Sequence, residues 1–267
     1  MKQRRHLLSA PTVPQHGRAA GADDGQRVLP ATTVTVAMVT FNAAETLERA
    51  LKSVVHHRST ALELVVMDGG SSDGTLEIIR RYRPAIASWR SEPDGGIYDA
   101  MNKAMQLATG DWLMFLGADD ELLVAPEQIL PRMSRRDAVY YGDVRIRSTD
   151  ARSGGRFSRY RLMQENICHQ AVLYPKSVYR HKRYDTTSGM LADHRYNIEL
   201  RGSGVPFIHL DEVISRFEDG GRSSVRDPRF EEIKLAAIRE CFGLHLYLAK
   251  RARTAVVRLL KTRDVAA

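Results

Sequence analysis

Two adjacent carboxylates, Asp119 and Asp120, follow an apolar run at residues 113–116. Glycine-containing turns lie on both sides of the run, so it is predicted to be a strand buried on both faces. In open α/β sheets, ligands bind beyond the carboxyl ends of the strands. Neighbouring carboxylates repel each other unless a cation lies between them. The pair therefore indicates a divalent ion and a phosphate ligand, with a solvated strand-end turn as the alternative.

A second candidate carboxylate, Asp68, ends another apolar run and precedes a glycine- and serine-rich turn at residues 69–74. Glycines allow a backbone to approach a ligand closely, and a carboxylate there can accept hydrogen bonds from a base or a ribose hydroxyl. The alternative is that Ser72 or Asp73 only caps the next helix. We favour a binding role for Asp68 and the structural role for Ser71, Ser72 and Asp73.

Strands and helices alternate over the first 120 residues, and these elements must position the two acidic sites. The predicted strands are 33–41, 62–67, 86–89 and 113–116, and the predicted helices follow Asn42 and span 75–82 and 97–107. Asn42 is expected to cap the first helix, with Glu45 at the capping-box position. The alternation predicts a mostly parallel sheet with helices on both faces. No G-x-G-x-x-G follows the first strand, which disfavours a dinucleotide-binding fold.

The pattern changes from about residue 138. Strands at 138–146 and 156–160 are predicted to form a hairpin around Gly154 and Gly155. Further along, the predicted elements are a short strand at 171–174, a helix at 192–200, an extended segment at 207–217 and helical structure from 229 almost to the end. No linker divides the two halves. We therefore expect one domain at 32–228, between a disordered basic tail (1–31) and a basic helical segment (229–267).

The bulk composition bounds the class of protein. The chain has 267 residues, which suffice for one large domain with short additions. Its two cysteines, Cys168 and Cys241, are far apart, so neither a disulfide framework nor a zinc site is predicted and a reducing cytosol is the simplest compartment. The net charge of +8 favours an anionic partner, such as nucleic acid, anionic lipid or a phosphorylated substrate. No segment reaches the ~20 apolar residues of a membrane-spanning helix.

Five motifs occur in order along the chain. They are Thr40-Phe41-Asn42, Asp68 to Thr75, Asp94 to Lys103, Gly110-Asp111-Trp112 and Gly117 to Asp120. In this order and spacing they resemble glycosyltransferase family 2, whose members have the GT-A nucleotide-sugar fold, over about residues 33–224. The stretches Cys168-His169-Gln170 and Ala192-Asp193-His194 resemble a bacterial subgroup that builds cell-surface polysaccharides and glycolipids.

The resemblance implies inverting transfer of a sugar from a nucleotide diphosphate to a hydroxyl of a glycan or lipid-linked acceptor, assisted by Mn²⁺ or Mg²⁺. The donor-side residues that it implies are Thr40, Phe41, Asn42, Asp68, Asp94, Gly95, Lys103, Ala118 and Arg222. It implies Asp119 and Asp120 as metal ligands and Asp193 as the catalytic base, with His169 and Gln170 on the acceptor side. Nucleic acid is not an expected partner of such an enzyme.

One position departs from the family pattern. The metal motif usually begins with an acid, and Gly117 occupies that position here. The loss of one carboxylate puts strict metal dependence in doubt, although the subgroup tolerates the change. Two non-catalytic alternatives stay open, a nucleotide-sugar-binding protein and a basic membrane-surface protein of the same fold. A nucleotidyltransferase is disfavoured because no glycine-rich, arginine-bearing loop follows the first strand.

The C-terminal helical segment separates basic from apolar residues. The basic ones are Lys250, Arg251, Arg253, Arg258, Lys261 and Arg263, and the apolar ones are Leu248, Ala252, Val256, Leu259 and Leu260. A basic amphipathic helix can lie on an anionic membrane, or it can pack on the domain with its basic side in water. We therefore expect a cytoplasmic protein and leave peripheral contact with the inner face of the cell membrane as an open alternative.

Overall fold

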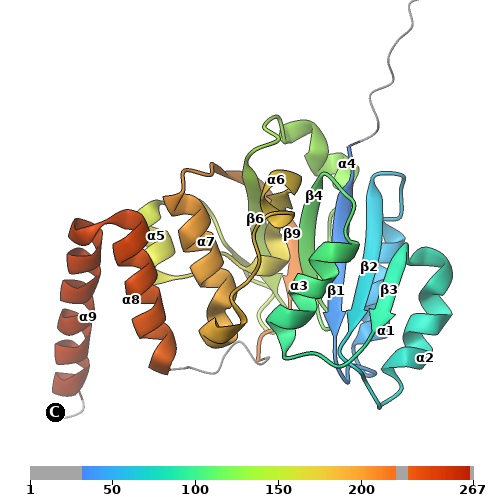
Figure 1. Ribbon diagram of the computed structural model, residues 1–267, viewed down its shortest axis with the longest axis horizontal. Coiled ribbons are helices and arrows are strands. Elements are labelled where there is room, and N and C mark those ends of the chain that lie inside the picture. The colour runs from blue at the N-terminus through green and yellow to red at the C-terminus, as the bar shows by residue number, and fades with distance from the viewer. Residues whose placement is uncertain (1–31, 221–227, 265–267) are drawn as a thin grey trace, which may run out of the picture. The chain divides into compact units, whose positions relative to one another are not determined.

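A computed structural model describes residues 32–220 and 228–264 of the chain, within a compact unit that spans 31–267 (Figure 1). The predicted basic tail, residues 1–31, and the predicted donor-side residue Arg222 lie outside the described residues. The division into a domain at 32–228 and a segment at 229–267 stays a prediction.

The described strands form a single sheet. They are β1 (Val34–Thr40), β2 (Leu62–Asp68), β3 (Ser88–Ser91), β4 (Trp112–Gly117), β5 (Glu121–Leu122), β6 (Val139–Ile146), β7 (Arg152–Ser153), β8 (Val172–Pro175) and β9 (Phe207–Phe217). Their order is β3-β2-β1-β4-β8-β6-β9-β5, and β7 pairs with β6. β1 to β4 are mutually parallel, and β8 runs antiparallel to its neighbours β4 and β6. The expected α/β fold, mostly parallel with a smaller antiparallel element, is confirmed.

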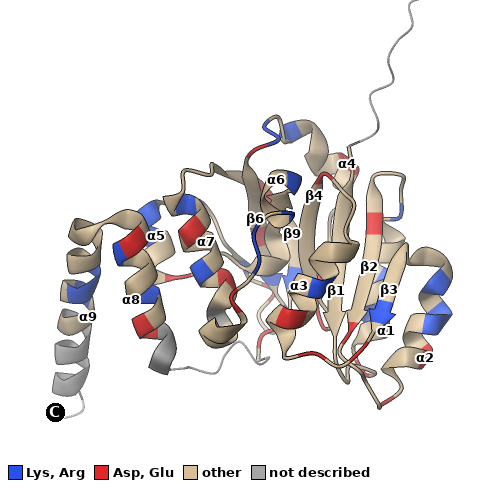
Figure 2. Cartoon of the chain, in the orientation of Figure 1, with Lys and Arg blue, Asp and Glu red and all other residues tan. Residues whose placement is uncertain are grey.

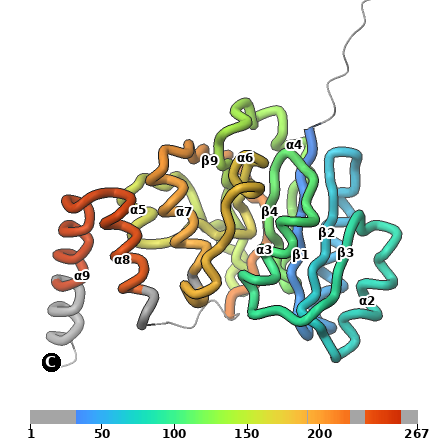
Figure 3. Tube along the Cα trace, in the orientation of Figure 1, coloured from blue at the N-terminus to red at the C-terminus, as the bar shows by residue number. Residues whose placement is uncertain are grey.

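Helices cover both faces of the sheet (Figures 1 and 3). The described α-helices are α1 (Leu47–His56), α2 (Thr75–Tyr82), α3 (Ile97–Leu107), α4 (Pro126–Ile129), α5 (Arg159–Gln164), α6 (Lys176–Tyr179), α7 (Ala192–Gly202), α8 (Pro228–Phe242) and α9 (Leu244–Asp264), of which α9 lies outside α8, away from the sheet. Alternate side chains of β1 face opposite cores, because successive residues of a strand point to opposite faces. Ala37 and Val39 pack in a core with α3, α7 and α8, whereas Val36 and Met38 pack in a core with α1 and α2.

The helix after β1 begins at Leu47, so the prediction that Asn42 caps it was wrong. Asn42 has φ +47°, in the left-handed region that Asn tolerates better than most residues. Its side chain accepts a hydrogen bond from the backbone N–H of Ser72 at 3.0 Å, and its own N–H donates to Ser71 Oγ at 2.8 Å. These bonds across the sheet edge take the residue out of the helix and join the β1 turn to the β2 turn.

The predicted strand at 156–160 was also wrong. The hairpin turn lies between β6 and β7, and the chain enters α5 at Arg159. Ser158 caps this helix, because its Oγ accepts a hydrogen bond from Arg161 N at 3.1 Å. The glycine pair lies after β7, in the segment that leads into α5, and not in the hairpin turn. Gly155 N donates to the buried Asp143 carboxylate at 2.6 Å, which holds this segment against β6.

The C-terminal helical segment is divided at Gly243, whose φ of +86° ends α8, and α9 packs against α8 and α5 (Figure 1). Lys250, predicted on an open basic face, is buried and donates to Gln164 Oε1 at 2.9 Å. By contrast, Leu244 and Leu248 are 59% and 53% exposed. The inner side of α9 therefore carries a lysine and its outer side carries leucines. No helix in the described parts of the chain is both long and apolar enough to cross a membrane.

Candidate active site

Parallel pairing brings the predicted donor-side residues at the ends of β1 and β2 to one edge of the sheet, beside the end of β4. In the strand register Thr40 lies opposite Asp68 and Val39 opposite Gly117, so β1, β2 and β4 end side by side. Several acidic residues lie in the loops at this edge (Figure 2). The arrangement agrees with the position expected for a ligand in an open α/β sheet.

Asp68 is fully buried at this edge and organises the turn that follows it. Its Oδ2 accepts hydrogen bonds from Gly70 N and Ser71 N, each at 3.0 Å, and from Ser91 Oγ at 2.6 Å, and its Oδ1 accepts from Ser71 Oγ. Both oxygens are thus engaged inside the protein, so Asp68 shapes the loop in this structure. The prediction that Ser72 or Asp73 caps the next helix was wrong, because Gly74 is the N-cap of α2. Asp73 precedes this cap, and its Oδ1 accepts a hydrogen bond from the N–H of Thr75 at 3.1 Å.

Phe41 and Asp94 meet over Gly69. A Cβ atom at Gly69 would overlap the Asp94 carboxylate and would lie 3.3 Å from Phe41 Cδ2, so any larger residue would displace the Asp94 side chain from this position. The Phe41 side chain is 50% exposed, which leaves an aromatic ring open to solvent at the rim. The buried Thr40 hydroxyl has no hydrogen-bond partner among the described residues. Phe41 and Asp94, from two separate segments, therefore form an aromatic and polar surface at the end of β1, with the buried Thr40 hydroxyl beneath it.

The loop before α3 is held by its own helix. Asp99 Oδ2 accepts a hydrogen bond from Gly95 N at 2.9 Å, and Lys103 Nζ lies 3.2 Å from carboxylate oxygens of both Glu92 and Asp99. The residues predicted to border the sugar diphosphate, Asp94 and Gly95, thus lie in a loop that is hydrogen-bonded to the first turn of α3. The Lys103 ammonium group pairs with the Glu92 and Asp99 carboxylates instead of extending from the loop.

Asp119 and Asp120 are adjacent but differ in environment. Asp120 is buried and accepts hydrogen bonds from Gly117 N at 3.2 Å and from Glu218 N at 2.9 Å. Burial raises the pKa of Asp120, and the neighbouring Asp119 charge adds to this effect. The Asp119 carboxylate is half-buried, and no hydrogen bond to it is recorded within the described residues. Ala118, predicted as a donor-side residue, is buried between β4 and this pair.

Steric crowding accounts for the glycine at the first position of the metal motif, Gly117. A Cβ atom at Gly117 would lie 2.5 Å from Asp120 Oδ2 and 2.7 Å from Asp119 Oδ1, so both carboxylates already fill the space of a longer side chain. Within residues 32–220 and 228–264, no group of three or more His, Cys, Asp or Glu could hold a metal ion. One open carboxylate still fits Mg²⁺ or Mn²⁺ when substrate phosphates supply further ligands, as hard divalent ions allow.

A closed ring of ion pairs lies behind the two acids, and the sequence analysis missed it. Arg49 contacts Glu121 and Glu218 at 3.0 Å each, and Arg147 contacts the same two glutamates at 2.5 and 2.7 Å. Arg49 also donates to the backbone carbonyl of Asp119 at 2.8 Å. The ring joins α1, β5 and the ends of β6 and β9, so it fixes the turn that presents Asp119. Its members are scattered along the sequence and share no motif.

Asp193, the predicted base, lies near the start of α7 and is 5% exposed. Its Oδ1 accepts a hydrogen bond from the Tyr98 hydroxyl at 2.9 Å, and its Oδ2 accepts from Asn166 Nδ2 at 2.7 Å and lies 3.6 Å from His169 Nδ1. Burial alone would raise the pKa of Asp193, but the hydrogen bonds and charge of His169 and the Tyr98 hydroxyl outweigh it and lower the pKa. The carboxylate is therefore ionised at neutral pH.

His169 links the base to the acid pair. Burial lowers its pKa, but the hydrogen bond and charge of Asp193 and the charges of Asp120 and Asp119 together raise it above the usual value. The neighbouring Gln170 is buried and lowers the pKa of Asp120 through a side-chain hydrogen bond. The two predicted acceptor-side residues thus lie between Asp193 and the Asp119–Asp120 turn, which places both acidic groups around one site.

A buried polar chain supports Asp193 from behind and was also missed. Asn197 Nδ2 donates to Asn166 Oδ1 at 3.0 Å, and the Tyr174 hydroxyl donates to Asn197 Oδ1 at 2.9 Å. Asn197 and Tyr174 have no exposed surface. None of these three residues belongs to a quoted motif, whereas Tyr98, the other hydrogen-bond partner of Asp193, lies in the Asp94 to Lys103 motif.

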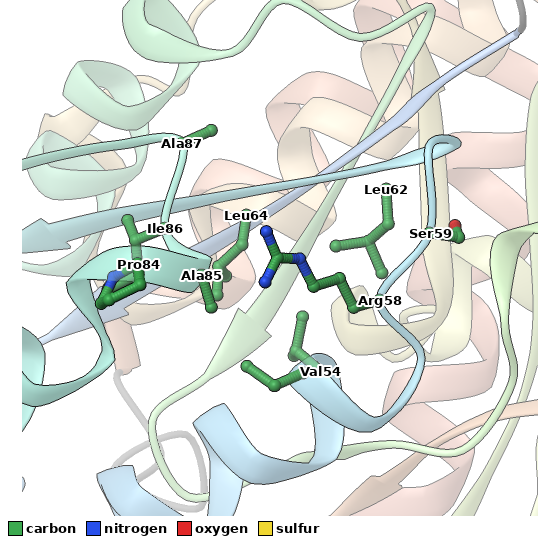
Figure 4. A pocket seen from close by; sticks show the side chains of 10 residues that line it. Val54, Arg58, Ser59, Leu62, Leu64, Pro84, Ala85, Ile86 and Ala87 are labelled. Carbon is green, nitrogen blue, oxygen red and sulfur yellow. The ribbon is translucent and has the colours of Figure 1, made fainter.

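A separate groove of about 220 Å³ lies at the opposite edge of the sheet, where α1 ends and β2 begins (Figure 4). Most of the residues that line it are apolar, and the Arg58 guanidinium points into it (Figure 4). None of the predicted site residues line this groove. The candidate active site is therefore the acidic edge and not this groove.

Comparison with known proteins agrees with the geometry. The profile of Glycosyl transferase family 2 matches residues 35–194. A PGL/p-HBAD biosynthesis glycosyltransferase of Mycobacterium bovis is 34% identical over 86% of this chain and 95% of its own length, and the Mycobacterium tuberculosis protein of the same name matches equally well.

Two solved structures share the fold. Staphylococcus aureus TarS 1–349 in complex with UDP-GlcNAc has a TM-score of 0.63 and 16% identity, over 79% of this chain and 67% of that one. The mannosyltransferase PcManGT from Pyrobaculum calidifontis, in complex with GDP-Man and Mn²⁺, has a TM-score of 0.59 and 19% identity, over 89% and 81%. Because the profile, the mycobacterial relatives and the acidic sheet edge agree, the chain belongs to glycosyltransferase family 2 and is a glycosyltransferase with the GT-A fold.

Proposed function

We propose that the protein transfers a sugar, with inversion, from a nucleotide diphosphate to a hydroxyl of a glycan or lipid-linked acceptor. The observation that carries this proposal is the ionised Asp193 carboxylate, linked through His169 to the Asp119–Asp120 turn. A base and a phosphate-side acid around one site are what direct displacement at a sugar carbon requires. The names of the mycobacterial relatives are consistent with a glycolipid acceptor.

Asp193 would take the proton of the acceptor hydroxyl as its oxygen attacks the sugar carbon. An alcohol is too weakly acidic to ionise alone at neutral pH, and a positioned general base contributes ~10²–10⁴ in rate. Attack from the face opposite the leaving diphosphate inverts the anomeric carbon. The low pKa of Asp193 keeps it ready to accept a proton, and its buried partners hold its orientation.

The donor would lie along the ends of β1, β2 and β4. The open Phe41 ring offers a stacking surface for the nucleotide base. Asp119 would hold Mn²⁺ or Mg²⁺, which as a Lewis acid would neutralise charge on the departing diphosphate. Because Asp120 is engaged by two backbone N–H groups, the ligand role predicted for it is not part of this proposal.

The first test combines a donor panel with a base variant. Thermal shift and calorimetry with UDP-, GDP- and dTDP-sugars, with and without Mn²⁺, identify the donor. Asp193→Asn should bind that donor as tightly as the wild type and should lose ~10²–10⁴ in turnover. Asp185→Asn is the matched control, because Asp185 pairs with Arg195 instead of joining the site. Near-normal turnover in Asp193→Asn removes it as the base.

The second test concerns the metal. Asp119→Ala should abolish the stimulation of nucleotide binding by Mn²⁺ or Mg²⁺, measured by titration calorimetry with the bare nucleoside diphosphate. Asp137→Ala removes an exposed acid just before β6, at the other edge, and should leave the stimulation unchanged. An unaltered metal response in Asp119→Ala contradicts the ligand assignment.

A peripheral membrane contact is a second proposal, supported by the outer side of α9. Leu244 and Leu248 are exposed one helical turn apart, and Arg251 and Arg253 are exposed beyond them. Apolar side chains with neighbouring cations suit an anionic lipid surface. Leu244→Ser with Leu248→Ser should weaken binding to phosphatidylglycerol-containing vesicles at low salt. Arg80→Gln with Arg81→Gln on α2 should not, and equal binding by both double variants refutes the α9 contact.

A further inference from the structure

Tyr98 places one hydroxyl between two acceptors. Its oxygen lies 2.9 Å from Asp193 Oδ1 and 2.7 Å from the backbone carbonyl oxygen of Met190. A phenol carries a single proton, so it can donate to only one of these oxygens at a time. Burial raises the pKa of the hydroxyl and the Asp193 charge raises it further, so the proton stays on the oxygen. The hydroxyl therefore has two hydrogen-bonded states that differ by rotation of the O–H bond.

The charge of Asp193 selects between the two states. A hydrogen bond to an ionised acceptor is about twice as strong as one between neutral groups. While Asp193 is a carboxylate, the hydroxyl donates to Oδ1. Once Asp193 is protonated, its oxygens are weaker acceptors and the Met190 carbonyl becomes the better partner. No buried donor loses its partner in either state, which avoids the cost of an unsatisfied polar group.

The other carboxylate oxygen has no such freedom. Oδ2 accepts from Asn166 Nδ2 at 2.7 Å, and Asn166 is fixed in that orientation because its Oδ1 accepts from Asn197 Nδ2. Asn197 is in turn fixed by the Tyr174 hydroxyl. A proton arriving on Oδ2 would face the Asn166 amide donor and the His169 imidazole, whose Nδ1 lies 3.6 Å away and whose pKa Asp193 raises. Oδ1, with one exchangeable partner, is therefore the oxygen suited to receive a proton.

We propose that Tyr98 is a positioning residue whose hydroxyl follows the protonation state of Asp193 during sugar transfer, an inference that rests on the proposed role of Asp193 as base. Before transfer, Tyr98 donates to Oδ1. As the acceptor O–H bond breaks, its electron pair forms the new bond to the sugar carbon and its proton goes to Oδ1. The bond from the sugar carbon to the diphosphate breaks, and its pair leaves with the nucleotide. The Tyr98 O–H then rotates to the Met190 carbonyl, and no proton passes between Tyr98 and Asp193.

The groups around Asp193 define what a titration would report. The titratable side chains that interact with it are Tyr98, Cys168, His169, Tyr174, Tyr184 and His194. Of these, Tyr98 makes the hydroxyl hydrogen bond to the carboxylate and His169 lies 3.6 Å from it. Tyr184 packs against Tyr98 with ring centroids 5.3 Å apart, and no hydrogen bond joins it to Asp193 within the described residues. Tyr184→Phe is therefore a matched control for Tyr98→Phe.

The first measurement is the pKa of the Asp193 carboxyl, followed by ¹³C NMR of aspartate-labelled full-length protein and assigned with Asp193→Asn. Removing a hydrogen bond to an ionised group raises the pKa by about one to two pH units. Tyr98→Phe should show this upward shift, fitted over the pH range in which circular dichroism shows the intact fold. Tyr184→Phe should superimpose on the wild type. A curve for Tyr98→Phe that superimposes on the wild type overturns the proposal.

The second measurement is made on wild-type Tyr98, so it does not depend on whether Tyr98→Phe folds. The ¹³Cζ resonance of a tyrosine responds to its hydrogen bond, so in the wild type the Tyr98 signal should titrate together with the Asp193 carboxyl carbon. In Asp193→Asn the Tyr98 signal should stay constant over the same pH range. A Tyr98 signal that ignores the Asp193 titration rules out the rotation.

Turnover of the donor identified by the panel separates the two proposals. If Asp193→Asn keeps normal turnover, the base assignment fails whatever the NMR result. If Asp193→Asn is inactive but Tyr98→Phe matches Tyr184→Phe in both kcat and carboxyl titration, only the role of Tyr98 fails. The expected result is a lower kcat for Tyr98→Phe at an unchanged KM for the donor, with its acid limb displaced upward by about one to two pH units.

Discussion

Restoring the missing acid of the metal motif is expected to damage the protein. A family pattern alone suggests that Gly117→Asp would strengthen metal binding, since it adds a carboxylate. The structure predicts the reverse, because a Cβ atom at this position would lie 2.5 Å from Asp120 Oδ2 and 2.7 Å from Asp119 Oδ1. The half-buried Asp119 carboxylate can turn away, but the buried Asp120 carboxylate, held by two backbone N–H groups, would have to move by most of an ångström to reach ordinary contact at 3.4 Å.

The magnitude follows in two steps. Overpacking by one methyl group costs about 1–3 kcal/mol, which is the expected loss for Gly117→Ala. Displacing Asp120 also strains the bonds that it accepts from Gly117 N and Glu218 N, and hydrogen bonds to charged groups are worth about 1.5–3 kcal/mol each. With a third negative charge added, Gly117→Asp should lose about 3–5 kcal/mol of unfolding free energy. At about 2–4 °C per kcal/mol, its Tm should fall by roughly 6–20 °C.

Urea and thermal unfolding measure these losses, and nucleotide calorimetry with Mn²⁺ measures the metal response. Gly95→Ala is the matched control, since its added Cβ would make only ordinary contacts at 3.8 Å and should leave Tm unchanged or slightly higher. We expect Gly117→Asp to gain no metal affinity. A Gly117→Asp protein with wild-type Tm, or one with tighter Mn²⁺ binding, would refute the steric account of this glycine.

Three further predictions concern elements around the site. Ser158→Ala should lower the unfolding free energy by about 1 kcal/mol in urea titration, because it removes the cap of α5; no change would contradict the corrected assignment of this segment. Arg49→Met should weaken nucleotide binding three- to tenfold by releasing the Asp119 carbonyl, whereas Lys52→Met, exposed on the same helix, should not; equal affinities would argue against the ring of ion pairs. Burial lowers the pKa of His194 to about 4, so the unfolded state binds a proton that the folded state refuses between pH 6.5 and 4. Stability should therefore fall as the pH falls through this range, by at most about 1.4 kcal/mol per unit, and His194→Gln should flatten that slope in urea titrations.

Elements with local signals could be predicted closely. The sequence analysis placed α2 at 75–82 and α3 at 97–107, the bounds that the structure has, because apolar periodicity and glycine at the preceding positions define them locally. Asn42 and the segment 156–160 were assigned wrongly for a shared reason. Their conformations depend on hydrogen bonds to residues far along the chain or to a buried partner, and local sequence patterns do not predict such bonds.

The site divides in the same way. The motifs placed Asp68, Asp119 and Asp193 at strand or helix ends, but their grouping depends on β8, which lies between β4 and β6 and carries the chain past His169. No spacing in the sequence predicts that a histidine before one strand will lie between acids from β4 and α7. The ring around Arg49 and the chain from Tyr174 to Asn166 likewise consist of single residues from distant elements.

The acids at this edge lie in two different kinds of environment. Asp68 and Asp120 are enclosed and accept backbone N–H groups, so each fixes the loop that follows its strand. Asp119 keeps a carboxylate that no described side chain engages, and Asp193 keeps its charge through a histidine and two hydrogen bonds. Pairs of carboxylates become useful when their surroundings differ, because one can then hold geometry while the other meets the substrate. The motif acids are therefore not equivalent. Substituting Asp120 should disorder the turn that it holds, so any loss of activity in such a variant would reflect that structural change and not a catalytic role of Asp120.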